Sequence, residues 1–247
     1  MGCEENSCDT NQGPVHYPYI NEYYIDQTEV TNADYVVFLN FLKEQNESCS
    51  FNGQQWPCGL GGGYEGGVHQ VWGVWEVMGG QAAYPIRKIT WYGAYAFCQW
   101  QGKRLPTEAE WEKAARSTDG RLYPWGDSAV SCDLVAGAFE CMGTKVVGSK
   151  SPQGDSPYGV SDLSGNALEW VADKYAYGYY GVSPTQNPQG SSQGSDSYTD
   201  RVLRGGPCTG WANIDDSYYF YSSYRDHKEP ALQSPLVGFR CAASQWE

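Results

Sequence analysis

The chain has 247 residues, and 29 acidic against 16 basic side chains give it a formal net charge of −13. An acidic surface argues against nucleic acid and anionic membranes as partners, because phosphate binding needs clustered basic side chains. We expect no membrane span, since no run of about 18 apolar residues is present. No signal-peptide pattern is found, so we expect a mature or trimmed chain.

The predicted elements begin with a strand. Residues 14–30 alternate aromatic and polar side chains, which is typical of a strand. Thr31 follows as a helix N-cap, and apolar residues recur at helical spacing from Asn32 to Leu42. A second helix is predicted from Trp91 to Gln101, with Cys98 among the aromatic residues of one face.

Residues 46–82, between these two helices, form a Gly-rich insertion that contains tryptophans. A third helix is predicted to begin at Thr107, because Thr107 and Glu110 match the capping-box pattern. Short strand-like segments and turns follow. Two main helices with many short strands and loops indicate an α+β fold. No repeat or linker divides the chain, so we expect a single domain over residues 1–247.

Nine cysteines are many for a cytosolic chain. No C-x-x-C pattern or Cys/His cluster is present, so we do not expect zinc. Disulfides made in an oxidising compartment explain the cysteines better, and they predict an extracellular or cell-surface protein; free thiols in a cytosolic protein are the alternative. A monomer leaves one cysteine over. The local pairs predicted are Cys3 with Cys8, Cys49 with Cys58, and Cys132 with Cys141.

Six short segments spread over the chain carry a further signal. They are YIDQTEVTN at 24–32, GKRLPTEAEWE at 102–112, YPWGD at 123–127, GVSDLSGNALEW at 159–170, RGG at 204–206 and GFR at 238–240. In this order they resemble the formylglycine-generating-enzyme family. The resemblance implies a C-type-lectin-like fold. It also implies a disulfide between Cys98 and Cys241, which leaves Cys208 as the odd cysteine.

The segment at 159–170 carries two carboxylates around a tight turn with free carbonyls. Hard cations such as Ca²⁺ prefer this mixture of oxygen ligands. By the resemblance, Asp162 and Glu169 supply side chains while Gly165 and Ala167 supply backbone oxygens. A second family site is matched by Asp133 and Leu134. We therefore expect structural calcium; a solvated acidic turn is the alternative.

The family's enzymes oxidise a sulfatase cysteine to formylglycine with two cysteines that bind Cu(I), a soft ion that prefers thiolates. By the resemblance, those two positions fall on Gly210 and Asp215, and Cys208 comes before them. Neither Gly nor Asp can replace a thiolate. We therefore expect no formylglycine activity; an oxidase of this type, or a related metal-dependent oxidase, is the alternative.

The closing segment, residues 204–241, keeps the family's pattern at its two ends. From Pro207 to Leu236 it is dense in small polar and aromatic residues. This resembles the variable proteins of diversity-generating retroelements, where adenine mutagenesis of Asn codons cannot produce Lys, Glu, Gln, Trp or Met. Residues of these types stand at positions that an invariant framework around the variable positions would need. The alternative explanation of the composition is ordinary sequence drift in an inactive relative. The residues of these types are Trp211, Lys228, Glu229 and Gln233.

Tyr together with small polar residues on a rigid scaffold makes a good binding surface, because Tyr gives large contact area at low entropic cost. We therefore predict a monomeric, ligand-binding display protein whose partner is an unknown protein or surface ligand. The predicted contact residues are Cys208, Thr209, Gly210, Trp211, Asn213, Ile214, Asp215, Asp216, Tyr218, Tyr219, Tyr221, Asp226, His227 and Leu232.

Overall fold

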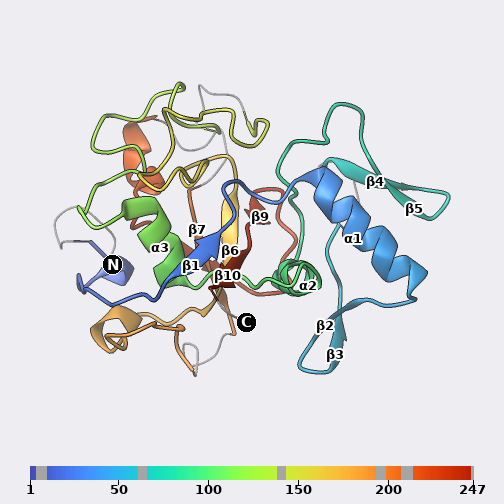
Figure 1. Ribbon diagram of the computed structural model, residues 1–247, viewed down its shortest axis with the longest axis horizontal. Helices are drawn as coiled ribbons and strands as arrows, with labels where there is room; N and C mark the ends of the chain where they lie inside the picture. The colour runs from blue at the N-terminus through green and yellow to red at the C-terminus, as the bar shows by residue number, and fades with distance from the viewer. Residues whose placement is uncertain (4–9, 61–65, 138–142, 193–198, 207–213, 246–247) are drawn as a thin grey trace.

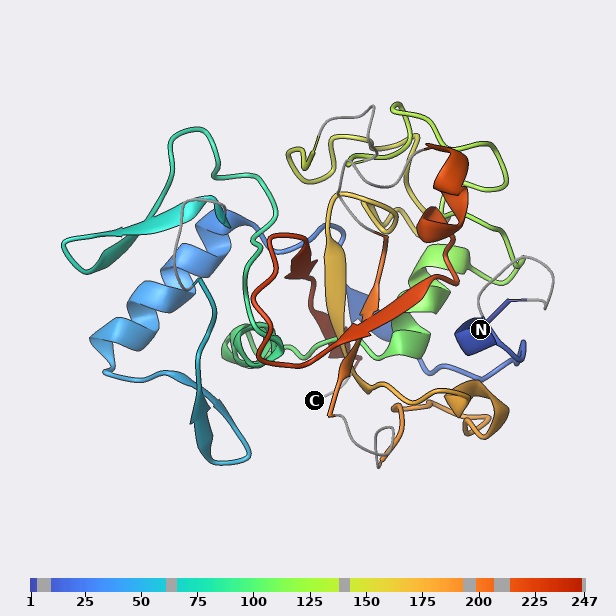
Figure 2. The same cartoon turned by 180° about the vertical axis from the view of Figure 1, so that it is seen from behind.

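The computed structural model describes residues 1–3, 10–60, 66–137, 143–192, 199–206 and 214–245, with the backbone alone at Thr10 and at 214–216. Four strands form a sheet near the middle of the molecule (Figures 1 and 2). They are β6 (Leu168–Lys174), β7 (Arg201–Arg204), β8 (Arg225–Lys228) and β9 (Val237–Phe239). Their order is β8-β7-β6-β9, with β9 parallel to β6 and the other neighbours antiparallel.

Three α-helices begin where the sequence indicates. Thr31 and Thr107 each close a capping box, with Asp34 and Glu110 respectively, and the Thr90 side chain accepts a hydrogen bond from a backbone N–H of its own helix. The predicted helices are confirmed, and the third is as regular as the two main ones. They are α1 (Asn32–Glu44), α2 (Trp91–Trp100) and α3 (Glu108–Arg116).

Strand β6 separates two apolar cores, because successive residues of a strand point to opposite faces of a sheet. Trp170 belongs to the larger core, which holds the buried residues of α1 and α2. Val171 belongs to the smaller core, beside the buried residues of α3. Aromatic rings fill the larger core: those of Tyr35, Phe97 and Phe239 lie in pairs with centroids 5.4 to 6.0 Å apart. Large aromatic side chains thus supply much of the buried area.

The strand predicted over residues 14–30 is wrong along most of its length. Only β1 (Tyr23–Ile25) forms there, and it pairs antiparallel with β10 (Ala242–Ser244). Pro14 and Pro18 have no N–H to donate to a strand ladder, so the alternating pattern before β1 does not form a strand.

The Gly-rich insertion forms two hairpins at one end of the molecule (Figures 1 and 2). Asn40 of α1 fixes the second hairpin: its side chain donates to the Trp75 carbonyl and accepts from the Trp75 N–H, both at 2.9 Å. The hairpin strands are β2 (Cys49–Phe51), β3 (Gln54–Trp56), β4 (Val68–Val71) and β5 (Val74–Val77). The short 3-10 helices are η1 (Thr10–Gln12), η4 (Tyr179–Gly181) and η5 (Ile214–Phe220).

Two of the predicted cysteine pairs are disulfides in the structure. Cys49–Cys58 spans the hairpin of β2 and β3. Cys98–Cys241 joins α2 to the residue before β10, with 5.6 Å between the two Cα atoms and 143 residues between them in sequence. The long-range bond therefore connects the middle of the chain to its end.

Cys3 and Cys132 are also disulfide-bonded. Their expected partners, Cys8 and Cys141, lie outside the described residues, as does Cys208, so these two pairings stay predictions. Within the part of the chain that the structure describes, no helix is long and apolar enough to cross a membrane.

Candidate functional site

The closing segment is attached to the scaffold by buried arginines. Arg204, the last residue of β7, donates to Glu112 at 2.8 Å. It also donates to the backbone carbonyls of Ser222 and Ser223 at 2.7 and 3.1 Å. One side chain thus joins the start of the segment both to α3 and to the residues that follow η5.

Arg225 makes a second attachment. Its Nε and Nη2 atoms donate to the two oxygens of Glu108, both at 2.9 Å, and both side chains are almost fully buried. Burial lowers the pKa of Arg225, but the Glu108 carboxylate more than offsets this, so the pKa lies above its ordinary value. The Tyr180 hydroxyl donates to the same carboxylate at 3.0 Å. Arg225 therefore stays charged inside the molecule.

The tyrosines of η5 and the residue after it lie beside the YPWGD loop. The Tyr218 and Tyr219 rings pack with centroids 4.0 Å apart. Tyr221 lies edge-on to Tyr123 at 5.4 Å, and Tyr123 stacks on Trp125 at 4.9 Å. Tyr218, Tyr219 and Tyr221 are half-buried, as is Trp125. Sequence reasoning named these tyrosines but missed Tyr123 and Trp125, for which the YPWGD motif was the available signal.

Phe220, within the same run of aromatic residues, faces inward and is 1% exposed. Its carbonyl accepts a hydrogen bond from the Ser164 hydroxyl at 2.7 Å. Gly206 has a φ of 77°, and a Cβ there would clash with the Tyr219 carbonyl, so no other residue fits easily. Phe220 and Gly206 therefore hold η5 in place and belong to the fixed framework of the closing segment.

The other predicted contact residues in the described part of the chain lie apart from these tyrosines. Asp226 and His227 are in β8 at the edge of the sheet. The His227 ring stacks on Tyr175 at 3.8 Å, and its Nδ1 lies 2.7 Å from Asp200 Oδ2. Leu232 packs against the larger core. The structure therefore does not gather all the predicted contact residues on one surface.

The remaining contact predictions stay untested. Residues Cys208, Thr209, Gly210, Trp211 and Asn213 lie outside the described residues, and the backbone alone is described at Ile214, Asp215 and Asp216. Every cysteine within the described residues is disulfide-bonded, so this part of the chain contains no thiol pair.

The side chains predicted to bind calcium lie in or close to β6. The buried Glu169 carboxylate accepts hydrogen bonds from Arg240 at 2.7 to 3.0 Å and from the Trp111 Nε1 atom at 2.8 Å. Asp162 is also buried, and it accepts from the Gly148 N–H. Glu169 therefore has a cationic partner already, whereas Asp162 is bound by a backbone amide.

The two predicted backbone ligands form the turn between these carboxylates. Gly165 has a φ of 85° and donates its N–H to the Gly205 carbonyl at 2.6 Å. Its own carbonyl accepts from the Ala167 N–H at 2.7 Å. A carbonyl has two lone pairs, so this bond leaves one for a cation.

Glu29 is a buried carboxylate that sequence reasoning missed, although it lies in the YIDQTEVTN motif. Its Oε1 atom accepts from Asn166 Nδ2 at 2.9 Å, whereas Oε2 is buried with no donor among the described residues. Burial and then the charge of Asp162 raise the pKa of Glu29 well above its ordinary value, and burial raises the pKa of Asp162. An orphaned oxygen beside a second carboxylate fits a hard cation.

Such a cation would also need carbonyl or water oxygens. Among the described residues, no three His, Cys, Asp or Glu side chains form a group that could hold a metal ion. At the second predicted site, Asp133 is exposed and the Leu134 carbonyl packs closely against Gly154.

Capped helices, short strands and long ordered loops define an α+β domain with the C-type-lectin-like architecture. A family profile described as the sulfatase-modifying factor enzyme 1-like domain (FGE-sulfatase) matches residues 1–245. The chain belongs to this family.

The chain is similar to proteins of several different kinds. A formylglycine-generating enzyme from Streptomyces coelicolor is 30% identical over 269 residues, covering 93% of this chain and 80% of the enzyme. The serine/threonine-protein kinase pkn1 of Chlamydia pneumoniae is 33% identical over 232 residues, 93% of this chain but only 34% of the kinase. The chain thus spans about a third of that relative's length. The solved Treponema denticola variable protein 1 shares the fold, with a TM-score of 0.66 at 23% identity, covering 98% of this chain and 90% of that one.

Proposed function

We propose that this chain is a non-catalytic, ligand-binding display protein that is located outside the cell or at its surface. Its contact positions lie between residues 207 and 236. The observation that carries the proposal is the contrast within the closing segment. Arg204, Arg225 and Phe220 are buried and engaged, whereas Tyr218, Tyr219 and Tyr221 keep partly exposed rings. A rigid frame with partly exposed tyrosines is the arrangement of good binding surfaces.

Family membership favours oxidase activity as the second candidate, and the residues at positions 210 and 215 argue against it. We expect the chain to produce no aldehyde on a sulfatase peptide with copper and oxygen, because Gly210 and Asp215 offer no soft ligand for Cu(I). Mass spectrometry of the peptide is the measurement, with the Streptomyces coelicolor enzyme as positive control. Aldehyde formed by the unaltered chain would overturn the non-catalytic proposal.

We also propose that a structural calcium ion binds at Asp162, with the Gly165 and Ala167 carbonyls and with Glu29 and Glu169 as the neighbouring carboxylates. Bound calcium would offset the charges of Glu29 and Asp162, whose ionised forms are disfavoured by burial, whereas Glu169 already has Arg240 as its partner. The orphaned Glu29 Oε2 supports this placement. A second ion at Asp133 and Leu134 rests on the sequence resemblance alone.

Calcium should therefore stabilise the protein. At a free concentration about 100 times the dissociation constant, the gain in unfolding free energy should be about 2.7 kcal/mol. Calorimetric titration should give heat, and the melting temperature should rise. Asp162→Asn should weaken this binding, whereas Glu44→Gln is the matched control, because it changes an exposed carboxylate outside both proposed calcium sites. No heat and no melting shift with the unaltered chain would contradict the proposal.

A further inference from the structure

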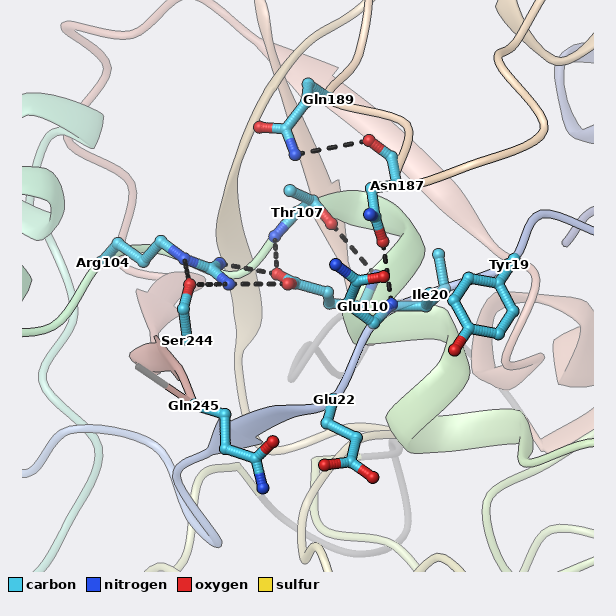
Figure 3. Close-up of a pocket in the computed structure, with 11 residues that line it drawn as sticks. Tyr19, Ile20, Glu22, Arg104, Thr107, Glu110, Asn187, Gln189, Ser244 and Gln245 are labelled. Carbon is cyan, nitrogen blue, oxygen red and sulfur yellow. Dashed lines mark hydrogen bonds and ion pairs between the residues drawn. The ribbon is translucent and has the colours of Figure 1, made fainter. Parts of the chain in front are cut away.

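A cavity of about 490 Å³ lies between residues 19–22, the start of α3, residues 187–189 and residues 244–245 (Figure 3). Its volume is within the range of ligand pockets, roughly 300–1,000 Å³. Four stretches of chain line it, and most of the side chains around the opening are polar.

The floor of this cavity offers no net charge. Arg104 donates to both oxygens of Glu110 at 2.7 Å, and its Nε and Nη2 atoms lie 3.3 Å from the Ser244 hydroxyl. The Thr107 N–H donates to the same carboxylate at 2.8 Å. Because guanidinium and carboxylate neutralise one another, a phosphate or carboxylate ligand would have to break this pair to bind ionically.

The rim is held in place by the backbone. The Tyr19 N–H donates to the Thr185 carbonyl, and the Asn187 N–H donates to the Tyr19 carbonyl, both at 2.8 Å. The Asn21 N–H donates to Asn187 Oδ1 at 2.8 Å. These bonds join two distant segments, so the rim is ordered before any ligand arrives and little entropy is lost on binding.

The rim nevertheless keeps unused polar groups. Among the described residues, the side chains of Asn21, Glu22 and Gln245 form no hydrogen bond, and Gln189 makes a single weak one at 3.4 Å. Side-chain amides donate and accept at once. The Tyr19 ring, 66% exposed, adds an aromatic surface at the same rim.

The geometry points to an uncharged saccharide as the ligand of this cavity. Neighbouring sugar hydroxyls each donate and accept, which matches a rim of amides and one carboxylate, and the C–H face of a pyranose can pack on the Tyr19 ring. The self-neutralised floor and the Glu22 carboxylate at the rim give an anionic ligand no advantage.

Saturation-transfer NMR on the full chain tests this, with the methyl glycosides of glucose, mannose, galactose and N-acetylglucosamine as probes. At least one glycoside should receive saturation. Tyr19→Ala should weaken its binding about tenfold, since it removes the aromatic contact. Gln189→Ala with Gln245→Ala should weaken it as well. Tyr177→Ala is the matched control, because Tyr177 is 65% exposed and does not line the cavity.

Three results would overturn the inference. The first is no transfer to any of the four glycosides. The second is binding that survives Tyr19→Ala and the double glutamine variant. The third is much stronger binding of glucuronate than of methyl glucoside, which would show that charge directs recognition. Tyr19, Gln189 and Gln245 are on the rim, and an unchanged melting temperature checks that each variant is folded.

Discussion

Replacing Cys98 and Cys241 by Ala together should lower the free energy of unfolding by about 5 kcal/mol, because the bond closes a loop of more than a hundred residues in the unfolded chain. The two residues are 143 apart in sequence and are both fully buried. Equilibrium unfolding in guanidinium chloride measures the loss.

The second disulfide provides the matched control. Cys49 and Cys58 are only 9 residues apart, so replacing both by Ala should cost about 2.5 kcal/mol on the same reasoning. An equal or larger loss from the short-range pair would contradict loop closure as the source of the stabilisation.

The second large effect is expected at Arg225. Arg225→Met should lower the unfolding free energy by about 3–5 kcal/mol, since it leaves the Glu108 carboxylate buried without its bidentate partner. Thermal and denaturant unfolding both report this change. The side chains of Arg225 and Glu108 are 0% and 1% exposed, so water cannot replace the lost bonds.

Arg121→Met is the control for this substitution. Arg121 also pairs with a carboxylate, Asp119, but that carboxylate is 53% exposed, and exposed pairs contribute roughly 0–1 kcal/mol. A loss at Arg225 no greater than the loss at Arg121 would show that the buried pair does not hold the closing segment.

The helices could be predicted because their signals are local. Each depends on a capping residue and the few residues after it, as Thr31 and Thr107 show. The absence of a strand before β1 could not be predicted from the alternating pattern, because the prolines that prevent pairing outweigh it. The disulfide from Cys98 to Cys241 came from the family resemblance, since sequence spacing alone says nothing of a contact across 143 residues.

The burial of charged side chains could not be predicted for a similar reason. Sequence patterns place arginine and glutamate at the surface, yet Arg204, Arg225 and Arg240 are buried with partners far away in the chain. Glu29 meets Asp162 only after folding, so its orphaned oxygen was invisible in the sequence. The half-buried tyrosines of the closing segment were predicted, whereas their neighbours Tyr123 and Trp125 were missed.

We propose that the closing segment is a fixed frame holding replaceable contact positions. Sequencing the gene and its surroundings in independent isolates tests it most directly. We expect the isolates to differ at the codons for positions such as Tyr218, Tyr219 and Tyr221. We also expect an adjacent reverse transcriptase gene and a near-copy of the 3′ end that carries Asn codons at these positions. The codons for Arg225 and Phe220 should not vary. Isolates that differ as often at the buried frame as at these tyrosines, with no near-copy, would contradict it.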